Sequence, residues 1–179
     1  MTAMRACRVH RRPRYVAGVL LWVCTFGSGC HMGGHRGASI SLTVPVVSYL
    51  QSQSSLAGKG SPIANFPTLE IFDRTGQAVY QSHDAGKNAE LLRSLPEAME
   101  GLKTLPNHAT LSQVIETFPG LAEKDRDALL DYRRPTLLSL SLEDCHACEL
   151  QEQATGPETK GRLVENGFNL LDIQFSQPK

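Results

Sequence analysis

An apolar segment that runs directly into a C-x-x-C motif constrains the fold of this chain more than any other feature. Residues 135–142 (PTLLSLSL) have the length and apolar content of a buried β-strand, and Glu143 and Asp144 follow as a turn. Cys145 and Cys148 come next, at the start of a segment with helical character. This order predicts a cysteine pair at the amino terminus of a helix, at the end of a strand in an α/β domain.

That position has a chemical purpose. The unpaired N–H groups and the positive dipole end of a helix amino terminus stabilise a thiolate, which is the nucleophilic form of cysteine. Cys145 is therefore expected to be the exposed attacking residue, and Cys148, one turn later on the same face, can resolve a mixed disulfide. His146 favours the thiolate when it is protonated. Four nearby carboxylates oppose the helix dipole, those of Glu143, Asp144, Glu149 and Glu152.

The cysteine count leaves other uses of the pair open. Of five cysteines, Cys7, Cys24 and Cys30 belong to an amino-terminal targeting segment, so the domain holds one pair. One pair is too few for a multi-disulfide scaffold and is half of a four-thiolate zinc site. A structural disulfide, or a copper or zinc half-site that includes His146, remain alternatives. A c-type haem site is disfavoured because Glu149, and not histidine, follows the motif. No cofactor is expected.

The first 29 residues have the three parts of a secretory signal. Five arginines lie between positions 5 and 14, the apolar stretch 15–26 follows, and small residues occupy 27–29. The apolar stretch is shorter than the roughly 20 residues of a membrane-spanning helix, so cleavage is the favoured interpretation.

Residues 27–30 resemble a bacterial lipobox, although Gly27 stands where leucine is usual. The resemblance implies that Cys30 carries a lipid and that residues 30–39 form a flexible tether to the periplasmic side of a membrane. His31 at the next position slightly favours the outer membrane.

Charge argues against a nucleic-acid partner. The chain of 179 residues has 18 basic and 18 acidic residues, but five of the basic ones lie in the targeting segment. The remainder is mildly acidic, and carboxylates surround the cysteine motif, whereas a nucleic-acid binder needs a basic stripe.

The segment PTLLSLSLEDCHACE resembles the thioredoxin superfamily, especially its membrane-tethered periplasmic members, over about forty residues from Arg134 to Phe175. The resemblance implies that Cys145 is the nucleophile and Cys148 the resolving thiol. The family places a cis-proline, a hairpin and a final helix after the motif, whereas here Pro67 and a hairpin lie upstream. Either the domain is a circular permutant with Pro67 facing the cysteines, or the hairpin is an amino-terminal addition and the site lacks its proline. The second is preferred, because a hairpin precedes the motif strand in many tethered members.

Residues 40–179 are expected to form one domain, an α/β fold with an incomplete or rearranged thioredoxin-like sheet, flanking helices and a preceding hairpin. A strand over 40–46 is confined to an edge by Pro45. The hairpin spans 68–81, a helical insert 87–132, and the strand–helix–strand unit 135–175. Capping boxes are predicted at Ser94 with Glu97 and at Thr110 with Gln113.

These observations predict an exported, membrane-anchored thiol–disulfide oxidoreductase or redox accessory that acts on protein thiols or disulfides. One alternative is a non-catalytic envelope lipoprotein with a thioredoxin-like binding fold and a structural disulfide. Another is a periplasmic copper or zinc carrier. His83 and Asp84 could form a base and its orienting residue, but a solvated loop pair is the favoured interpretation.

Overall fold

A computed structural model describes residues 36–52, 66–118, 120–131 and 133–177. The predicted signal segment, Cys30 and most of the loop before the hairpin lie outside these ranges. Five strands form one mixed sheet in the order β1-β5-β4-β2-β3. The strands are β1 (Ser39–Pro45), β2 (Thr68–Phe72), β3 (Ala78–Ser82), β4 (Thr136–Leu142) and β5 (Asn169–Ser176).

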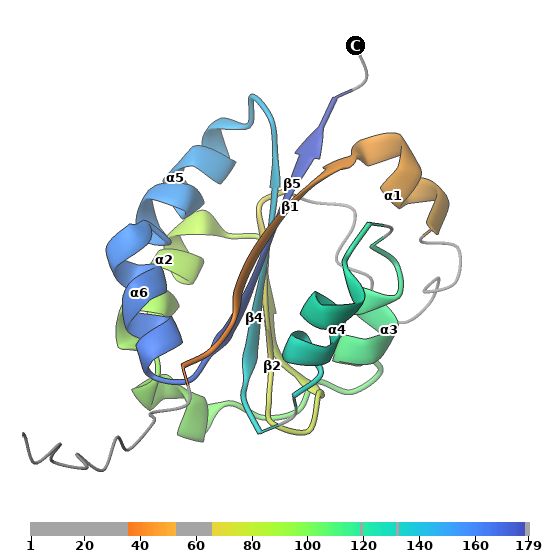
Figure 1. Cartoon of the computed structure of the whole chain (residues 1–179). Helices are drawn as coiled ribbons and strands as arrows, with labels where there is room; N and C mark the ends of the chain where they lie inside the picture. Colours follow the sequence, from red (N-terminus) through yellow and green to blue (C-terminus); the bar gives the residue numbers. More distant parts are fainter. Residues whose placement is uncertain (1–35, 53–65, 119, 132, 178–179) are drawn as a thin grey trace, which may run out of the picture. The chain divides into compact units, whose positions relative to one another are not determined.

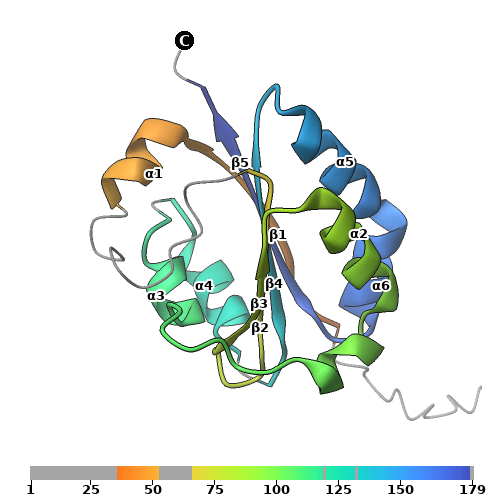
Figure 2. The same cartoon turned by 180° about the vertical axis from the view of Figure 1, so that it is seen from behind.

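Helices cover both faces of the sheet, as Figures 1 and 2 show from opposite sides. One face, called here the motif face, carries α2, α5 and α6, and the other carries α1, α3 and α4. The helices are α1 (Val46–Ser52), α2 (Ala85–Ser94), the 3-10 helix η3 (Glu97–Gly101), α3 (Leu111–Ile115), α4 (Glu123–Leu129), α5 (His146–Ala154) and α6 (Pro157–Glu165). The three layers confirm an α/β class for the domain.

The strand that leads to the cysteines is the middle strand of the sheet. β4 runs parallel to β5, which runs parallel to β1, while β2 is antiparallel to both β4 and β3. Because successive side chains of a strand point to opposite faces, Leu138 and Leu140 enter the core beneath α3 and α4, and Leu137 enters the core of the motif face. Burial on both faces explains the nearly continuous apolar run of β4.

The predicted hairpin is confirmed and belongs to the central sheet. Its turn is closed by Asp73, whose Oδ1 accepts hydrogen bonds from Thr75 N at 2.8 Å and Gln77 N at 3.1 Å, and Gly76 has a φ of 76°. The bond between Phe66 and Pro67 is cis.

The position of the hairpin brings Pro67 to the motif end of the sheet. Thr68 of β2 is paired with Leu140 of β4 in an antiparallel register, so Pro67 lies next to the carboxyl end of β4. Its side chain is buried. Periodicity along the sequence could not reveal this pairing, because it joins strands about seventy residues apart.

Other local predictions have mixed outcomes. The strand at 40–46 is confirmed as the edge strand β1, which ends at Pro45. The capping interaction at Thr110 is present, since its N–H donates to Gln113 Oε1 at 3.1 Å. The predicted capping box at Ser94 is wrong: Ser94 Oγ donates to Leu91 O at 2.9 Å. The physical reason is Pro96, which disfavours the helical conformation in the residue before it and so ends α2.

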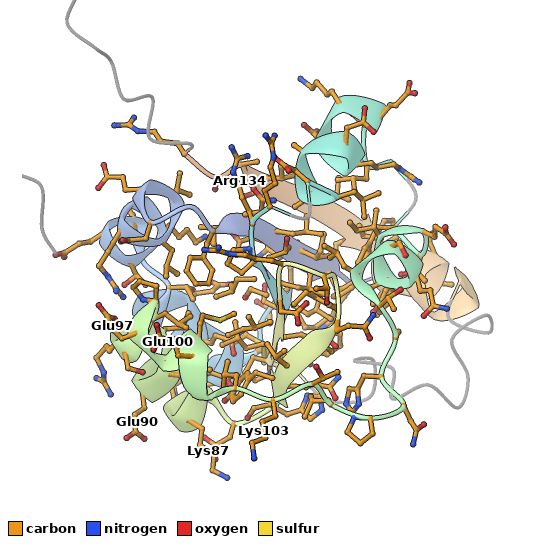
Figure 3. All side chains as sticks on the ribbon, turned by 90° about the horizontal axis from the view of Figure 1, so that it is seen from below. Lys87, Glu90, Glu97, Glu100, Lys103 and Arg134 are labelled. Carbon is orange, nitrogen blue, oxygen red and sulfur yellow. A yellow bond between two sulfur atoms is a disulfide. The ribbon has the colours of Figure 1, made fainter. Side chains whose placement is uncertain are left out.

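The region of the helical insert consists of short helices. Between α2 and β4 the described chain contains η3 and two short helices, α3 and α4. Figure 3 views the end of the sheet opposite to the cysteines, with Glu97 and Glu100 on η3 and Arg134 in the segment before β4. No helix in the described part of the chain is both long and apolar enough to cross a bilayer.

Candidate functional site

Cys145 caps the amino terminus of α5, as the sequence predicts. Its backbone is extended, with φ −100° and ψ 105°, and its carbonyl accepts hydrogen bonds from Cys148 N at 2.9 Å and Glu149 N at 3.1 Å. Its Sγ also accepts from Cys148 N, at 3.2 Å. The sulfur therefore occupies the place that a serine or aspartate oxygen takes in an ordinary helix cap.

The two cysteines form a disulfide and differ in exposure. Cys145 and Cys148 are joined across a Cα–Cα distance of 5.1 Å. Cys148 is 1% exposed, whereas Cys145 is partly exposed. The N–H of Leu142 at the end of β4 also reaches Cys148 Sγ, at 3.5 Å. An incoming thiolate thus has access to the first sulfur and not to the second.

A tight turn joins β4 to the motif. Glu143 N donates to Phe175 O at 3.0 Å, which continues the pairing of β4 with β5. Asp144 then has a φ of 59°, a left-handed conformation that aspartate tolerates better than most residues. The carboxylate of Glu143 accepts a hydrogen bond from Gln177 N at 3.3 Å. That carboxylate is therefore directed toward the end of β5.

His146 and Glu149 form a solvent-exposed pair on the first turn of α5. Their side chains are 87% and 63% exposed, and His146 Nδ1 lies 3.3 Å from Glu149 Oε2. Among the hydrogen bonds of the described residues, none joins His146 to either sulfur. His146 can therefore influence the cysteines only through space, and a carboxylate beside it partly offsets its charge.

A buried amide network that was not predicted from the sequence fixes α5 to the sheet. Gln151 is 1% exposed, and its Nε2 donates to Ser139 Oγ at 3.0 Å and to Thr68 O at 3.2 Å. Its Oε1 accepts from Asn88 Nδ2 on α2 at 2.6 Å, and Asn88 Oδ1 accepts from Tyr80 OH at 3.0 Å. The network connects the motif helix to β2, β4 and α2. Ser139, a polar residue in a mostly apolar strand, was the available signal.

His83 and Asp84 do not form a base with its orienting residue. Asp84 caps α2, where its Oδ1 accepts from Gly86 N at 2.9 Å and Lys87 N at 3.1 Å. His83 Nδ1 instead lies 2.9 Å from Thr68 Oγ1. The two side chains serve separate local structures.

A buried titratable group, Glu70, lies on the face of the sheet opposite to the motif. Glu70 of β2 is 1% exposed, and its Oε2 has no hydrogen-bond partner. Burial raises the pKa of Glu70 from 4.5 to about 8. Burial, and to a smaller extent the charge of Glu70, also raises the pKa of Tyr49. Glu70 was not among the predicted functional residues, although a carboxylate within the short strand segment TLEIF is a visible signal.

The described residues contain no group of three or more histidine, cysteine or acidic side chains arranged to hold a metal ion. The proposed lipid-bearing residue, Cys30, lies outside the described residues. Of the predicted site residues, the structure brings together Cys145 and Cys148, and it places Pro67 at the same end of the sheet.

No protein-family model, curated protein or solved structure matches this chain. The structure itself establishes an α/β domain with a five-stranded mixed sheet and a C-x-x-C pair at disulfide distance.

Proposed function

We propose that this chain is an exported, membrane-anchored thiol–disulfide oxidoreductase or redox accessory that uses Cys145 and Cys148. The observation that carries the proposal is the place of Cys145, a partly exposed sulfur at the amino-terminal cap of α5 that accepts the Cys148 N–H. When the disulfide is reduced, that N–H and the positive end of the helix dipole stabilise a thiolate on Cys145.

The difference in exposure supports distinct roles for the two sulfurs. In the direction that oxidises a client, a client thiolate attacks Cys145 Sγ, a mixed disulfide forms, and the Cys148 sulfur leaves as a thiolate that takes up a proton. A second client thiolate then attacks the client sulfur of the mixed disulfide, which releases the client disulfide and the Cys145 thiolate. Two electrons pass from client to protein, and the reverse sequence reduces a client.

We further propose that the domain is thioredoxin-like in a circularly permuted order. Three features support it: the motif follows the middle strand, β5 lies parallel to that strand, and the strand after the cis-proline lies antiparallel on its other side. In this proposal Pro67 lies beside the cysteines and shapes the surface on which a client docks.

The proposed location rests on the sequence alone. The signal-like segment and the lipobox-like residues before Cys30 imply export and a lipid anchor on the periplasmic side, with the outer membrane slightly favoured. Globomycin treatment of a bacterium that expresses the chain tests this, because blocked lipoprotein processing would leave a larger precursor. A Cys30→Ser variant that still partitions with membranes would contradict lipid attachment at that residue.

The deciding experiment is the reduction potential of the pair. Equilibration in buffers of graded dithiothreitol or glutathione ratio, followed by trapping of free thiols, should show a reversible two-electron couple within the range of catalytic dithiols, above about −300 mV. A disulfide that resists these buffers would instead support the structural alternative. Stoichiometric copper or zinc on the reduced protein, lost in Cys145→Ser, would support the metal carrier.

A turnover assay complements this measurement. Wild-type protein should accelerate reduction of insulin by dithiothreitol or oxidative refolding of a reduced client. Cys145→Ser should abolish the acceleration, whereas Cys148→Ser should accumulate a mixed disulfide with the client. An exposed, uncharged change on the same helix, Gln153→Ala, serves as the matched control and should retain full activity.

A further inference from the structure

Part of the motif face of the sheet is polar, beyond the region that its apolar core covers. Side-chain alternation directs two rows of residues to this face, and each row crosses the three parallel strands β1, β5 and β4. Toward the amino ends of β4 and β5 the same face is apolar, with Leu137 and Leu170 in the core. The two polar rows are Ser41, Asp172 and Ser139, and then Thr43, Gln174 and Ser141.

The polar rows form the floor of a cavity of about 360 Å³. The end of α5 and the beginning of α6 form its wall and contribute Glu152, Thr155 and Lys160. Lys160 Nζ lies 2.9 Å from Asp172 Oδ2, with the two side chains 37% and 20% exposed. The cavity therefore holds charges of both signs next to several hydroxyl groups. None of its lining side chains is aromatic.

The floor combines exposed residues, such as Ser41 and Gln174, with the more enclosed Ser141. Ser141 is 8% exposed, and among the described contacts its hydroxyl has no hydrogen-bond partner. Its neighbour in the other row, Ser139, is 6% exposed and is already bonded to Gln151. The serine as a whole is more than nine-tenths buried and lines the cavity, so a ligand that donates to its hydroxyl or accepts from it can add a hydrogen bond.

We infer that this cavity binds a small zwitterion, an amino acid or short peptide with a free ammonium and a free carboxylate. The ligand carboxylate would accept hydrogen bonds from Lys160 Nζ and the Ser141 hydroxyl. The ligand ammonium would donate to the carboxylate oxygens of Asp172 and Glu152. Charges of both signs fit a zwitterion better than a simple anion. A sugar ring is less well matched, because the cavity offers no aromatic side chain on which it could stack.

The cavity adjoins the cysteine site without including it. Ser141 directly precedes Leu142, whose N–H reaches Cys148 Sγ, and α5 forms a wall of both sites. The inference does not depend on redox activity, because no sulfur lines the cavity. A protein whose cysteines prove inert would still be expected to bind the zwitterion.

Isothermal titration and NMR shift mapping of the full-length oxidised chain with glycylglycine test the inference. Binding is expected with a Kd of about 1 mM or tighter, with shifts centred on Ser141 and Lys160. The doubly blocked, uncharged N-acetylglycinamide should bind at least about tenfold more weakly, because it offers neither charge. Equal binding of the two probes, binding of glucose in place of glycylglycine, or no binding at about 10 mM would overturn the inference.

Variants locate the site. Lys160→Met should weaken glycylglycine binding by about tenfold or more, and Ser141→Leu should abolish it by filling the cavity. Arg36→Met is the matched control, because Arg36 pairs with Glu165 at 3.9 Å on the exposed surface, and it should leave binding unchanged. Cys145→Ser with Cys148→Ser should also bind normally, which separates this inference from the redox proposal. Unchanged binding in both Lys160→Met and Ser141→Leu, with melting temperatures like wild type, would place the ligand elsewhere.

Discussion

Asn88 on α2 donates a 2.6 Å hydrogen bond to Gln151 on α5, and both side chains are fully buried. The pair joins the two helices that begin at the motif end of the sheet. Because Gln151 also bonds Ser139 and Thr68, the helix that carries Cys145 and Cys148 has one well-defined position over β4 and β2. We expect a fixed helix to keep the cap geometry of Cys145 the same after reduction of the disulfide.

This network predicts a large loss of stability in Gln151→Ala. The change removes three buried hydrogen bonds, those of Gln151 with Asn88, Ser139 and Thr68, at a cost of about 1–3 kcal/mol for each buried group that is left unsatisfied. Urea unfolding of the oxidised protein should show a decrease of at least about 2 kcal/mol in the free energy of unfolding. Gln153→Ala, an exposed change two residues away, should stay within about 0.5 kcal/mol of wild type. Equal stability of the two variants would show that the network contributes little.

The unequal exposure of the cysteines predicts unequal alkylation after reduction. Cys145 is partly exposed and accepts the Cys148 N–H, while Cys148 is 1% exposed, so iodoacetamide should modify Cys145 at least about tenfold faster. A time course analysed by peptide mass spectrometry measures both rates. In a denaturing concentration of urea, about 8 M, the alkylation rates of the two cysteines should converge. Faster modification of Cys148 in the native protein would contradict the proposed roles.

Glu70 predicts a fall in stability as pH rises. Its pKa of about 8 in the folded protein lies above 4.5, so between these values the folded state binds more protons than the unfolded state. The free energy of unfolding therefore decreases with pH across this window and levels off above about pH 8. From pH 4.5 to pH 7, the titration of Glu70 lowers the free energy of unfolding by about 3 kcal/mol.

Urea unfolding from pH 5 to pH 8 compares wild type with Glu70→Gln. The glutamine variant should lose most of this pH dependence, because it is uncharged at every pH. Glu97→Gln on the surface helix η3 is the matched control and should leave the slope as in wild type. Parallel curves for wild type and Glu70→Gln would show that the buried carboxyl does not carry the effect.

The capping role of Asp84 predicts a moderate and specific effect. Asp84→Ala removes the acceptor for Gly86 N and Lys87 N and should lower the free energy of unfolding by about 1 kcal/mol. Asp84→Asn keeps an acceptor oxygen, so its free energy of unfolding should stay within about 0.3 kcal/mol of wild type. If Asp84→Ala causes the same loss in a His83→Ala background, the two residues act separately. If the loss disappears in that background, His83 and Asp84 act as a pair after all.

The sequence alone was sufficient for most features that depend on neighbours along the chain, although not for the cap at Ser94. An apolar run followed by Glu143, Asp144 and a C-x-x-C predicted the strand, the turn and Cys145 at a helix start. Gly76 with Asp73 predicted the hairpin turn, and Pro45 predicted the edge strand. Each of these follows from backbone conformations and hydrogen bonds within a few residues.

Tertiary structure decided which strands are partners, and with them the rest of the site. The pairing of Thr68 with Leu140 placed Pro67 beside the end of β4, and the sheet register aligned Ser41, Asp172 and Ser139 in one polar row. The same assembly buried Glu70 and connected Asn88 to Gln151 across 63 positions of sequence. Strand order and burial depend on the packing of segments far apart in the chain, and side-chain periodicity contains no information about which distant segment lies alongside.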